Sequence, residues 1–210
     1  MAPSETPPRH FSMIREFHLA DFFTLGNAAC GMAGVFLAML YMASDSTQHF
    51  LWAAAMAPVA FVFDVLDGRI ARWRQQHSAL GRELDSLADV ISFGVAPATL
   101  VFAAGARGGW DALILVYFVC CGVSRLARYN VTAETLSEGS GKVKYFEGTP
   151  IPTSVALTGV LAYCAWQGLV DENLWGGVWR IGPWALHPLT LLFGLSGTLM
   201  ISKTLHIPKL

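Results

Sequence analysis

The stretch Phe22–Ala43 contains no charged residue and is long enough to cross a membrane as a single helix. A transmembrane helix needs about 20 consecutive, mostly apolar residues. Five further apolar stretches follow, so that the predicted spans are about 22–43, 50–74, 82–104, 110–130, 152–170 and 183–202. The sequence therefore predicts an all-α, polytopic membrane protein with six transmembrane helices.

Composition agrees with this class of protein. Of the 210 residues, 54% are hydrophobic and 14% are charged, whereas a soluble domain has about 25% charged residues. The net charge of -1 and the lack of a basic stripe argue against a nucleic-acid partner. Residues 1–10, which are rich in proline, are expected to be disordered, and 11–210 to form one membrane domain. Phe11–Asp21 mixes apolar and charged residues and predicts a short amphipathic helix on the membrane surface.

The positive charges predict an orientation. All Lys and Arg residues except Arg107 and Arg180 fall at the N-terminus, after the second and fourth spans, or at the C-terminus. The positive-inside rule then places both termini in the cytoplasm, and in a bacterial cell the membrane would be the inner one. An aromatic belt is expected at the outer face, formed by Trp110, Trp175, Trp179 and Trp184.

Four aspartates interrupt the second and third spans. Asp64 and Asp67 are three residues apart, and Asp85 and Asp89 are four apart. Either spacing puts both side chains on one face of a helix. A short loop around residues 75–80 joins the two helices, which are therefore expected to be antiparallel neighbours with converging acids.

Four carboxylates together in a membrane protein need compensating positive charge. Arg72 can offset one of them, whereas divalent cations can offset all four. Oxygen ligands without His or Cys favour Mg²⁺ or Mn²⁺, and four shared carboxylates suit a two-metal site acting on a phosphoryl group. Gly68, Ala71 and Gly81 leave room for a ligand or for close helix approach, and Arg72 is suited to contact a phosphate.

Other interpretations compete with this one. A single intramembrane acid usually belongs to an ion pair, a proton relay or an ion pathway. Small residues in spans usually mark helix packing, and this is the interpretation for six other glycines: Gly31, Gly34, Gly94, Gly159, Gly194 and Gly197.

The eight positions Asp64, Asp67, Gly68, Ala71, Arg72, Gly81, Asp85 and Asp89 resemble the complete signature of the CDP-alcohol phosphotransferase family. The six predicted spans agree with the fold of that family. The resemblance implies that the four aspartates share two divalent cations and that Asp89 is also the general base. It implies that Asp67, Gly68, Ala71, Arg72 and Gly81 contact the CDP group. Asn27 is a further candidate contact, with an interhelical hydrogen bond as the alternative.

Four other segments resemble the phosphatidylserine synthase branch of the family, namely residues 23–31, 83–98, 121–131 and 145–152. This implies CDP-diacylglycerol and L-serine as substrates, phosphatidylserine and CMP as products, and a homodimer among membrane lipids. The serine carboxylate calls for an arginine fork, which Arg125 and Arg128 could form on one helix face. They could equally be topology signals or lipid anchors. Gly148 and Pro150, in a defined turn, are further candidates for serine binding.

The alternatives are the same chemistry with glycerol 3-phosphate, inositol or inositol phosphate, or with an archaeal type of CDP-lipid. A more distant one is a cation transporter, which would distribute its acids across the membrane. Here the four acids cluster near one face, and the outer halves of the predicted spans are expected to lack an acidic partner.

Overall fold

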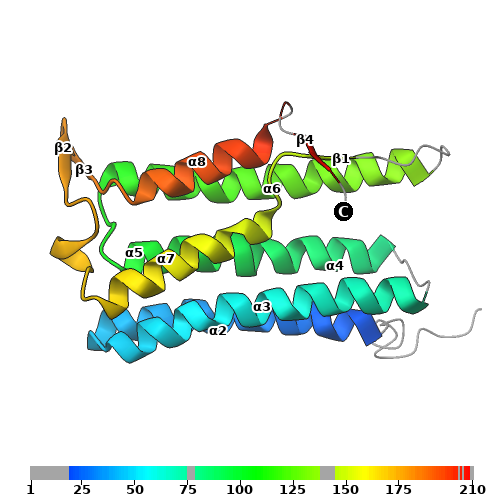
Figure 1. Ribbon diagram of the computed structural model, residues 1–210, viewed down its shortest axis with the longest axis horizontal. Helices are drawn as coiled ribbons and strands as arrows, with labels where there is room; N and C mark the ends of the chain where they lie inside the picture. The colour runs from blue at the N-terminus through cyan, green and yellow to red at the C-terminus, as the bar shows by residue number, and fades with distance from the viewer. Residues whose placement is uncertain (1–18, 75–78, 138–144, 203, 205, 209–210) are drawn as a thin grey trace, which may run out of the picture.

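The computed structural model describes residues 19–74, 79–137, 145–202, 204 and 206–208. These residues are mostly helical, and the long helices lie side by side in an elongated bundle (Figure 1). The expected disorder of residues 1–10 and most of the expected surface helix, up to residue 18, lie outside the described residues. Leu19–Asp21, the end of that expected helix, already belong to the first transmembrane candidate.

Helices α2 (Leu19–Ser44) and α3 (Thr47–Arg74) form an antiparallel pair along one side of the bundle (Figure 1). The next segment is one continuous helical stretch of three consecutive elements. They are α4 (Ala79–Asp89), the π-helix η1 (Val90–Val95) and α5 (Ala96–Ala103). Helix α6 (Gly109–Ser137) follows on the opposite side from α2 and α3. Helix α3 ends at Arg74 and α4 begins at Ala79, so most of the loop predicted around residues 75–80 lies outside the described residues.

The rest of the chain is built from shorter elements. They are the 3₁₀-helix η2 (Ile151–Thr153), α7 (Ser154–Trp166), the 3₁₀-helix η3 (Asp171–Asn173) and α8 (Thr190–Ile201). By length and composition, four described helices can cross a membrane: Leu19–Ser44, Thr47–Trp73, Leu80–Ala103 and Gly109–Thr132. The apolar helices Ile151–Trp166 and Thr190–Ile201 coincide with the fifth and sixth predicted spans but are shorter.

Two small sheets correct the all-α prediction. Strand β1 (Tyr145–Glu147) pairs with β4 (His206–Pro208), and β2 (Trp179–Ile181) pairs with β3 (Trp184–Leu186), both antiparallel. The first part of the predicted span 183–202 is therefore a hairpin strand, and helix α8 begins only at Thr190. Gly182, at a φ of 63°, makes the tight turn between β2 and β3. The two sheets lie at opposite ends of the bundle (Figure 1).

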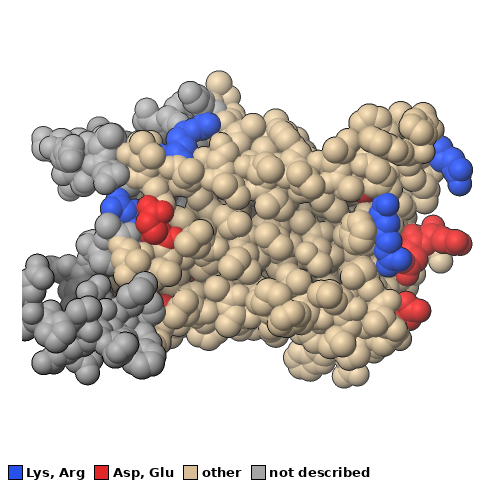
Figure 2. Space-filling model, turned by 180° about the vertical axis from the view of Figure 1, so that it is seen from behind, with Lys and Arg blue, Asp and Glu red and all other residues tan. Residues whose placement is uncertain are grey.

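The surface between the two ends is apolar. In Figure 2 the Lys, Arg, Asp and Glu side chains of the visible face gather at the two ends, with a belt of other residues between them. Large apolar side chains such as Phe36, Trp52, Val62 and Val116 are more than half exposed. A soluble protein rarely exposes so much contiguous apolar surface. The chain is therefore an integral membrane protein.

Five of the six glycines interpreted as packing positions do meet a neighbouring element. The tightest is Gly31, where a Cβ atom would lie 2.7 Å from the Cα of Ser92. Gly159 is the exception, because a Cβ there would meet nothing within 4 Å. Its assignment to helix packing is wrong within the described chain.

Candidate metal centre

Three of the four predicted acids come together between α3 and α4. One carboxylate oxygen each of Asp64, Asp67 and Asp85 lies within 4.8 Å of the other two. Asp64 and Asp67 share a face of α3 through their three-residue spacing, and Asp85 faces them from α4. The predicted convergence of these acids on two neighbouring helices is confirmed for these three.

Asp89 lies one turn beyond Asp85, at the last position of α4. Its side chain is buried and lies outside the 4.8 Å group, although it interacts electrostatically with Asp64 and Asp85. Asp85 therefore lies closer than Asp89 to the carboxylates of α3, and Asp89 lies one turn further into the bundle.

The cluster has the donor set that a hard divalent cation requires. Among the described residues, no Lys or Arg forms an ion pair with any of the four carboxylates. Oδ1 of Asp85 is buried and has no hydrogen-bond partner in the described chain. An uncompensated buried oxygen beside two further carboxylates is costly unless a cation fills the space. Mg²⁺ and Mn²⁺ favour such all-oxygen sites, so the residues fit the expected ions.

Helix α2 contributes two polar side chains that contact these acids. Thr24 Oγ1 donates a hydrogen bond of 2.7 Å to Oδ2 of Asp67, and Asn27 Nδ2 donates one of 3.1 Å to Oδ1 of Asp89. The interhelical hydrogen bond considered for Asn27 is therefore present. Oδ1 of Asn27 is fully buried and has no hydrogen-bond partner among the described residues. Thr24 was not predicted from the sequence, although its position one turn before Asn27 places both on one helix face.

The residues expected to contact a CDP group lie on the same two helices. Arg72 is exposed, and its guanidinium folds back so that a Cβ on Gly68 would lie 3.5 Å from Nη1. Arg72 also attracts the charge of Asp67. Ala71 and Gly81 are half-buried, on α3 and α4 respectively. The space beside Gly68 is thus occupied by the exposed cationic side chain of Arg72, which is suited to contact a phosphate.

Of the two candidate arginines on α6, Arg125 is the one that interacts with an acid of the cluster, Asp89. Its Nε is buried and has no hydrogen-bond partner in the described chain, and Asp89 interacts with it electrostatically. Arg128, three residues further on, is half-buried. An arginine with an unused buried donor near a carboxylate is suited to bind a small anion.

The predicted turn around Gly148 and Pro150 is well defined. Gly148 has a φ of 71°, and a Cβ there would collide with the carbonyl oxygen of Met200. Thr149 N donates to Leu199 O at 3.2 Å, which fastens the turn to the end of α8. The following Ile151 is buried, and its side chain meets both Gly94 of η1 and Gly122 of α6. The turn is thereby held beside η1, which directly follows Asp89, and beside α6, which carries Arg125.

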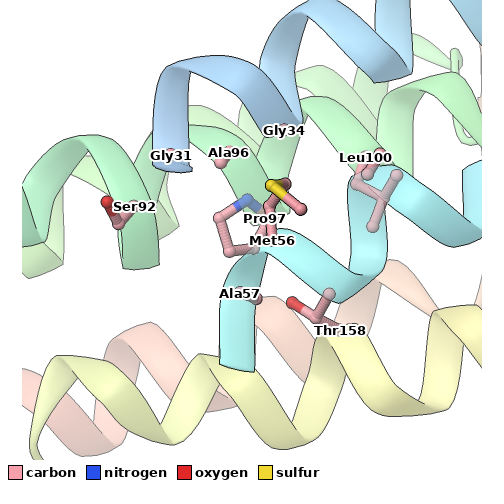
Figure 3. Close-up of a pocket in the computed structure, with 10 residues that line it drawn as sticks. Gly31, Gly34, Met56, Ala57, Ser92, Ala96, Pro97, Leu100 and Thr158 are labelled. Atoms are coloured by element: carbon pink, nitrogen blue, oxygen red, sulfur yellow. The ribbon is translucent and has the colours of Figure 1, made fainter. Parts of the chain in front are cut away.

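A small cavity lies further into the bundle from the acids. Figure 3 shows its lining, which comes from α2, α3, η1, α5 and α7 and is mostly apolar. Ser92 and Thr158 are its polar side chains, and both hydroxyls donate to backbone carbonyls. The cavity is separate from the carboxylates and offers no group for chemistry.

A buried acid at the opposite end corrects the expectation that the outer halves of the spans lack acidic partners. Asp111, near the start of α6, is fully buried and accepts four hydrogen bonds. The donors are the backbone N–H groups of Gly108 and His187, His187 Nδ1 at 2.6 Å and Thr190 Oγ1 at 2.9 Å. Because Asp111 of α6 accepts hydrogen bonds from His187, which follows β3, and from Thr190, which begins α8, it links α6 to this segment.

Comparison with known proteins shows which family the chain resembles. Residues 17–195 match the CDP-alcohol phosphatidyltransferase family. The chain is 44% identical over 203 residues to a CDP-diacylglycerol–serine O-phosphatidyltransferase of Saccharomyces cerevisiae. The matched region covers 95% of this chain and 74% of that relative. It is 36% identical to the Mycobacterium bovis protein of that name over 67% of this chain and 49% of the relative. An archaetidylserine synthase of Methanothermobacter thermautotrophicus is 35% identical over 65% of this chain and 54% of the relative.

Proposed function

Because this chain belongs to the CDP-alcohol phosphatidyltransferase family, we propose that it transfers a phosphatidyl group from CDP-diacylglycerol to L-serine. The products are phosphatidylserine and CMP. The similarity to the serine O-phosphatidyltransferase of Saccharomyces cerevisiae over 95% of this chain carries the choice of serine.

In this proposal, Asp64, Asp67, Asp85 and Asp89 hold two divalent cations, Mg²⁺ or Mn²⁺. Cations bound there neutralise the negative charge that develops on the leaving phosphate and lower the barrier to attack. The close approach of the first three carboxylates and the unpartnered Oδ1 of Asp85 support this assignment.

Asp89 accepts the proton of the serine hydroxyl. The hydroxyl oxygen then forms a bond to the phosphorus next to the diacylglycerol, and the bond from that phosphorus to the CMP oxygen breaks. The Asn27 amide donates to Oδ1 of Asp89 and so orients this carboxylate for the proton transfer. A base within hydrogen-bond reach of the attacking hydroxyl contributes typically 10²–10⁴-fold, as an order of magnitude, to such a step.

The remaining contacts orient the two substrates. Arg72 turns from Gly68 towards the CDP phosphates, while Gly68, Ala71 and Gly81 leave space for the nucleotide, and Oδ1 of Asn27 accepts a hydrogen bond from it. Arg125, with an unused buried Nε, binds the serine carboxylate, and Arg128 assists from the same helix. The turn at Gly148 and Pro150 closes the serine side of the site.

The proposed topology has six spans, with α7 and α8 as the two shorter ones. Both termini and the acids face the cytoplasm, and the β2–β3 hairpin with its tryptophans lies at the outer face. The β1–β4 sheet lies towards the same end of the bundle as the end of α3 and the start of α4, which supports this orientation (Figure 1). The functional unit is a homodimer, as the resemblance implies.

The test is the release of CMP by the purified protein in detergent or lipid. CDP-diacylglycerol and Mn²⁺ or Mg²⁺ are supplied with serine, glycerol 3-phosphate, inositol or inositol phosphate in separate reactions. We expect release with serine alone. Release with another acceptor would reassign the alcohol, and no release with any of them would refute the transferase activity.

The similarity to an archaetidylserine synthase favours one second candidate, in which the donor carries an archaeal type of lipid. The same assay with the CDP derivative of an archaeal diether lipid distinguishes the two donors. A higher kcat/KM for the diether donor would select the second candidate.

A further inference from the structure

The helix that carries Asp85 and Asp89 changes its winding immediately after Asp89. Residues Val90–Val95 form a π-helix, and α5 then resumes regular α-helical winding at Ala96. A π-helical turn accommodates an extra residue, and such turns are frequent at functional sites. Here the turn brings Ser92, Phe93 and Gly94 into the interior, where all three are buried.

Ser92 is the residue of this turn that contacts α2. Its side chain is 1% exposed, and its Oγ donates a hydrogen bond of 2.8 Å to the carbonyl oxygen of Asn27. Gly31 makes the approach possible, because a Cβ there would lie 2.5 Å from Ser92 Oγ and 2.9 Å from its backbone nitrogen. Figure 3 shows Ser92 and Gly31 on facing helices at one end of the cavity.

Asn27 continues this contact to the acid. Its side chain is fully buried, and its Nδ2 donates to Oδ1 of Asp89 at 3.1 Å. Asn27 of α2 therefore accepts a hydrogen bond from Ser92 through its backbone carbonyl and donates one to Asp89 through its side chain. Ser92 and Asp89 are three positions apart in the sequence. Two bonds between α2 and this helical stretch restrict both the rotation of the helix and the direction of the Asp89 carboxylate.

We propose that Ser92 is a positioning residue for phosphatidyl transfer, acting through Asn27 on the orientation of Asp89. Gly31 is the small residue that allows it. This inference rests on the proposed function, in which Asp89 takes the proton of the serine hydroxyl. A misplacement of about 1 Å at a reacting group can cost on the order of a hundredfold in rate, so a hydroxyl that holds the base in place affects turnover without touching the substrate.

The test is a double-mutant cycle of Ser92→Ala and Asn27→Ala, with CMP release from CDP-diacylglycerol and serine as the readout. We expect Ser92→Ala to lower kcat about tenfold and to change the serine KM less than about twofold. In the Asn27→Ala background, Ser92→Ala should have no further effect on kcat, because the side-chain amide that transmits the Ser92 contact to Asp89 is gone, although the backbone carbonyl that Ser92 binds remains. Gly31→Ala should lower kcat like Ser92→Ala, since its Cβ would push α2 away from Ser92.

Thr158→Val is the matched control, because this buried hydroxyl also donates to a backbone carbonyl, that of Ser154, but does so within its own helix. We expect it to leave kcat unchanged. Two further readouts do not depend on turnover: the melting temperature, and the affinity for CMP with Mn²⁺ measured by calorimetry. The melting temperature of Ser92→Ala should be close to that of Thr158→Val, and the CMP affinities of these two variants should also be close.

An unchanged kcat in Ser92→Ala would overturn the inference, as would kcat losses that add in the double variant. A lowered melting temperature with parallel loss of CMP affinity would assign Ser92 a purely structural role and overturn it as well. These results leave the proposed function intact if the wild-type protein releases CMP with serine. Absence of wild-type release would refute both.

Discussion

Oγ1 of Thr24 in α2 lies 2.7 Å from Oδ2 of Asp67 in α3, although the two residues are 43 positions apart in the sequence. Together with the bond from Asn27 to Asp89, this contact makes α2 the common support of two acids on different helices. Helix α2 carries none of the four aspartates, but it contacts Asp67 of α3 and Asp89 of α4 and so helps to fix the distance between these two helices.

Replacing Thr24 with Val should weaken cation binding. The substitution keeps the shape of the side chain but removes the donor that orients Asp67, and losing such a supporting contact typically costs about 10–100-fold in metal affinity. Titration with Mn²⁺, followed by electron paramagnetic resonance, measures this change. Thr99→Val, which removes an exposed hydroxyl that donates to the carbonyl oxygen of Val95 one turn earlier, is the control. Equal Mn²⁺ affinities of the two variants would show that Thr24 does not support the site.

Asp89→Asn should abolish turnover while nucleotide binding is retained. The amide has nearly the same shape as the carboxylate but cannot accept the proton of serine. CMP release should fall by at least about 10²-fold, and calorimetry with CMP and Mn²⁺ should still detect binding. Asp171→Asn, at a half-exposed acid paired with Arg107, is the control and should retain activity. Turnover by Asp89→Asn close to the wild-type rate would remove Asp89 from the role of general base.

Arg125→Ala should raise the KM for serine more than the KM for CDP-diacylglycerol. The guanidinium has a buried, unpartnered Nε near Asp89, so its loss removes a contact that only the small acceptor can use. We expect an increase of about tenfold or more, as for the loss of a charge-assisted hydrogen bond, and a smaller increase for Arg128→Ala. Steady-state kinetics with each substrate varied separately measures both constants. Equal increases in the two KM values would exclude Arg125 from the serine pocket.

Asp111→Asn should lower stability and leave the chemistry unchanged. The carboxylate accepts four hydrogen bonds in a fully buried position, and an amide would turn its NH₂ group towards some of these donors. Disrupting such a buried network costs on the order of 3 kcal/mol, or a fall in melting temperature of about 6–12 °C for a chain of this size. A thermal unfolding curve in detergent measures the shift, with Asp171→Asn as the control. A change in the serine KM at low temperature would contradict the separation of this cluster from the active site.

The acid cluster was predictable because local spacing determines it. Offsets of three and four residues place Asp64 with Asp67 and Asp85 with Asp89 on single helix faces, and the short connection between α3 and α4 makes the helices neighbours. The contacts from Thr24 and Asn27 depend on which face of α2 meets these helices. The residue spacing within α2 does not specify which of its faces meets α3 and α4. For this reason Thr24 was not predicted, and two interpretations remained for Asn27.

The departures from the predicted helices have local causes that hydropathy does not report. The predicted span 183–202 instead begins with strand β3 of a hairpin, because Gly182 and Pro183 favour a turn over a helix. Helix and strand cannot be told apart by apolar content alone in so short a run. The π-helix after Asp89 also leaves no hydrophobic signature, since it shifts the facing residues by one position without changing their composition.

The central claim, that α3 and α4 hold divalent cations between their aspartates, is tested most directly by counting Mn²⁺ ions bound to the purified wild-type chain. Equilibrium dialysis combined with electron paramagnetic resonance should give two Mn²⁺ per chain with a coupled spectrum, and Asp64→Asn or Asp85→Asn should remove at least one of them. Absence of bound Mn²⁺ in the wild-type protein, or binding that these substitutions leave unchanged, would contradict the claim.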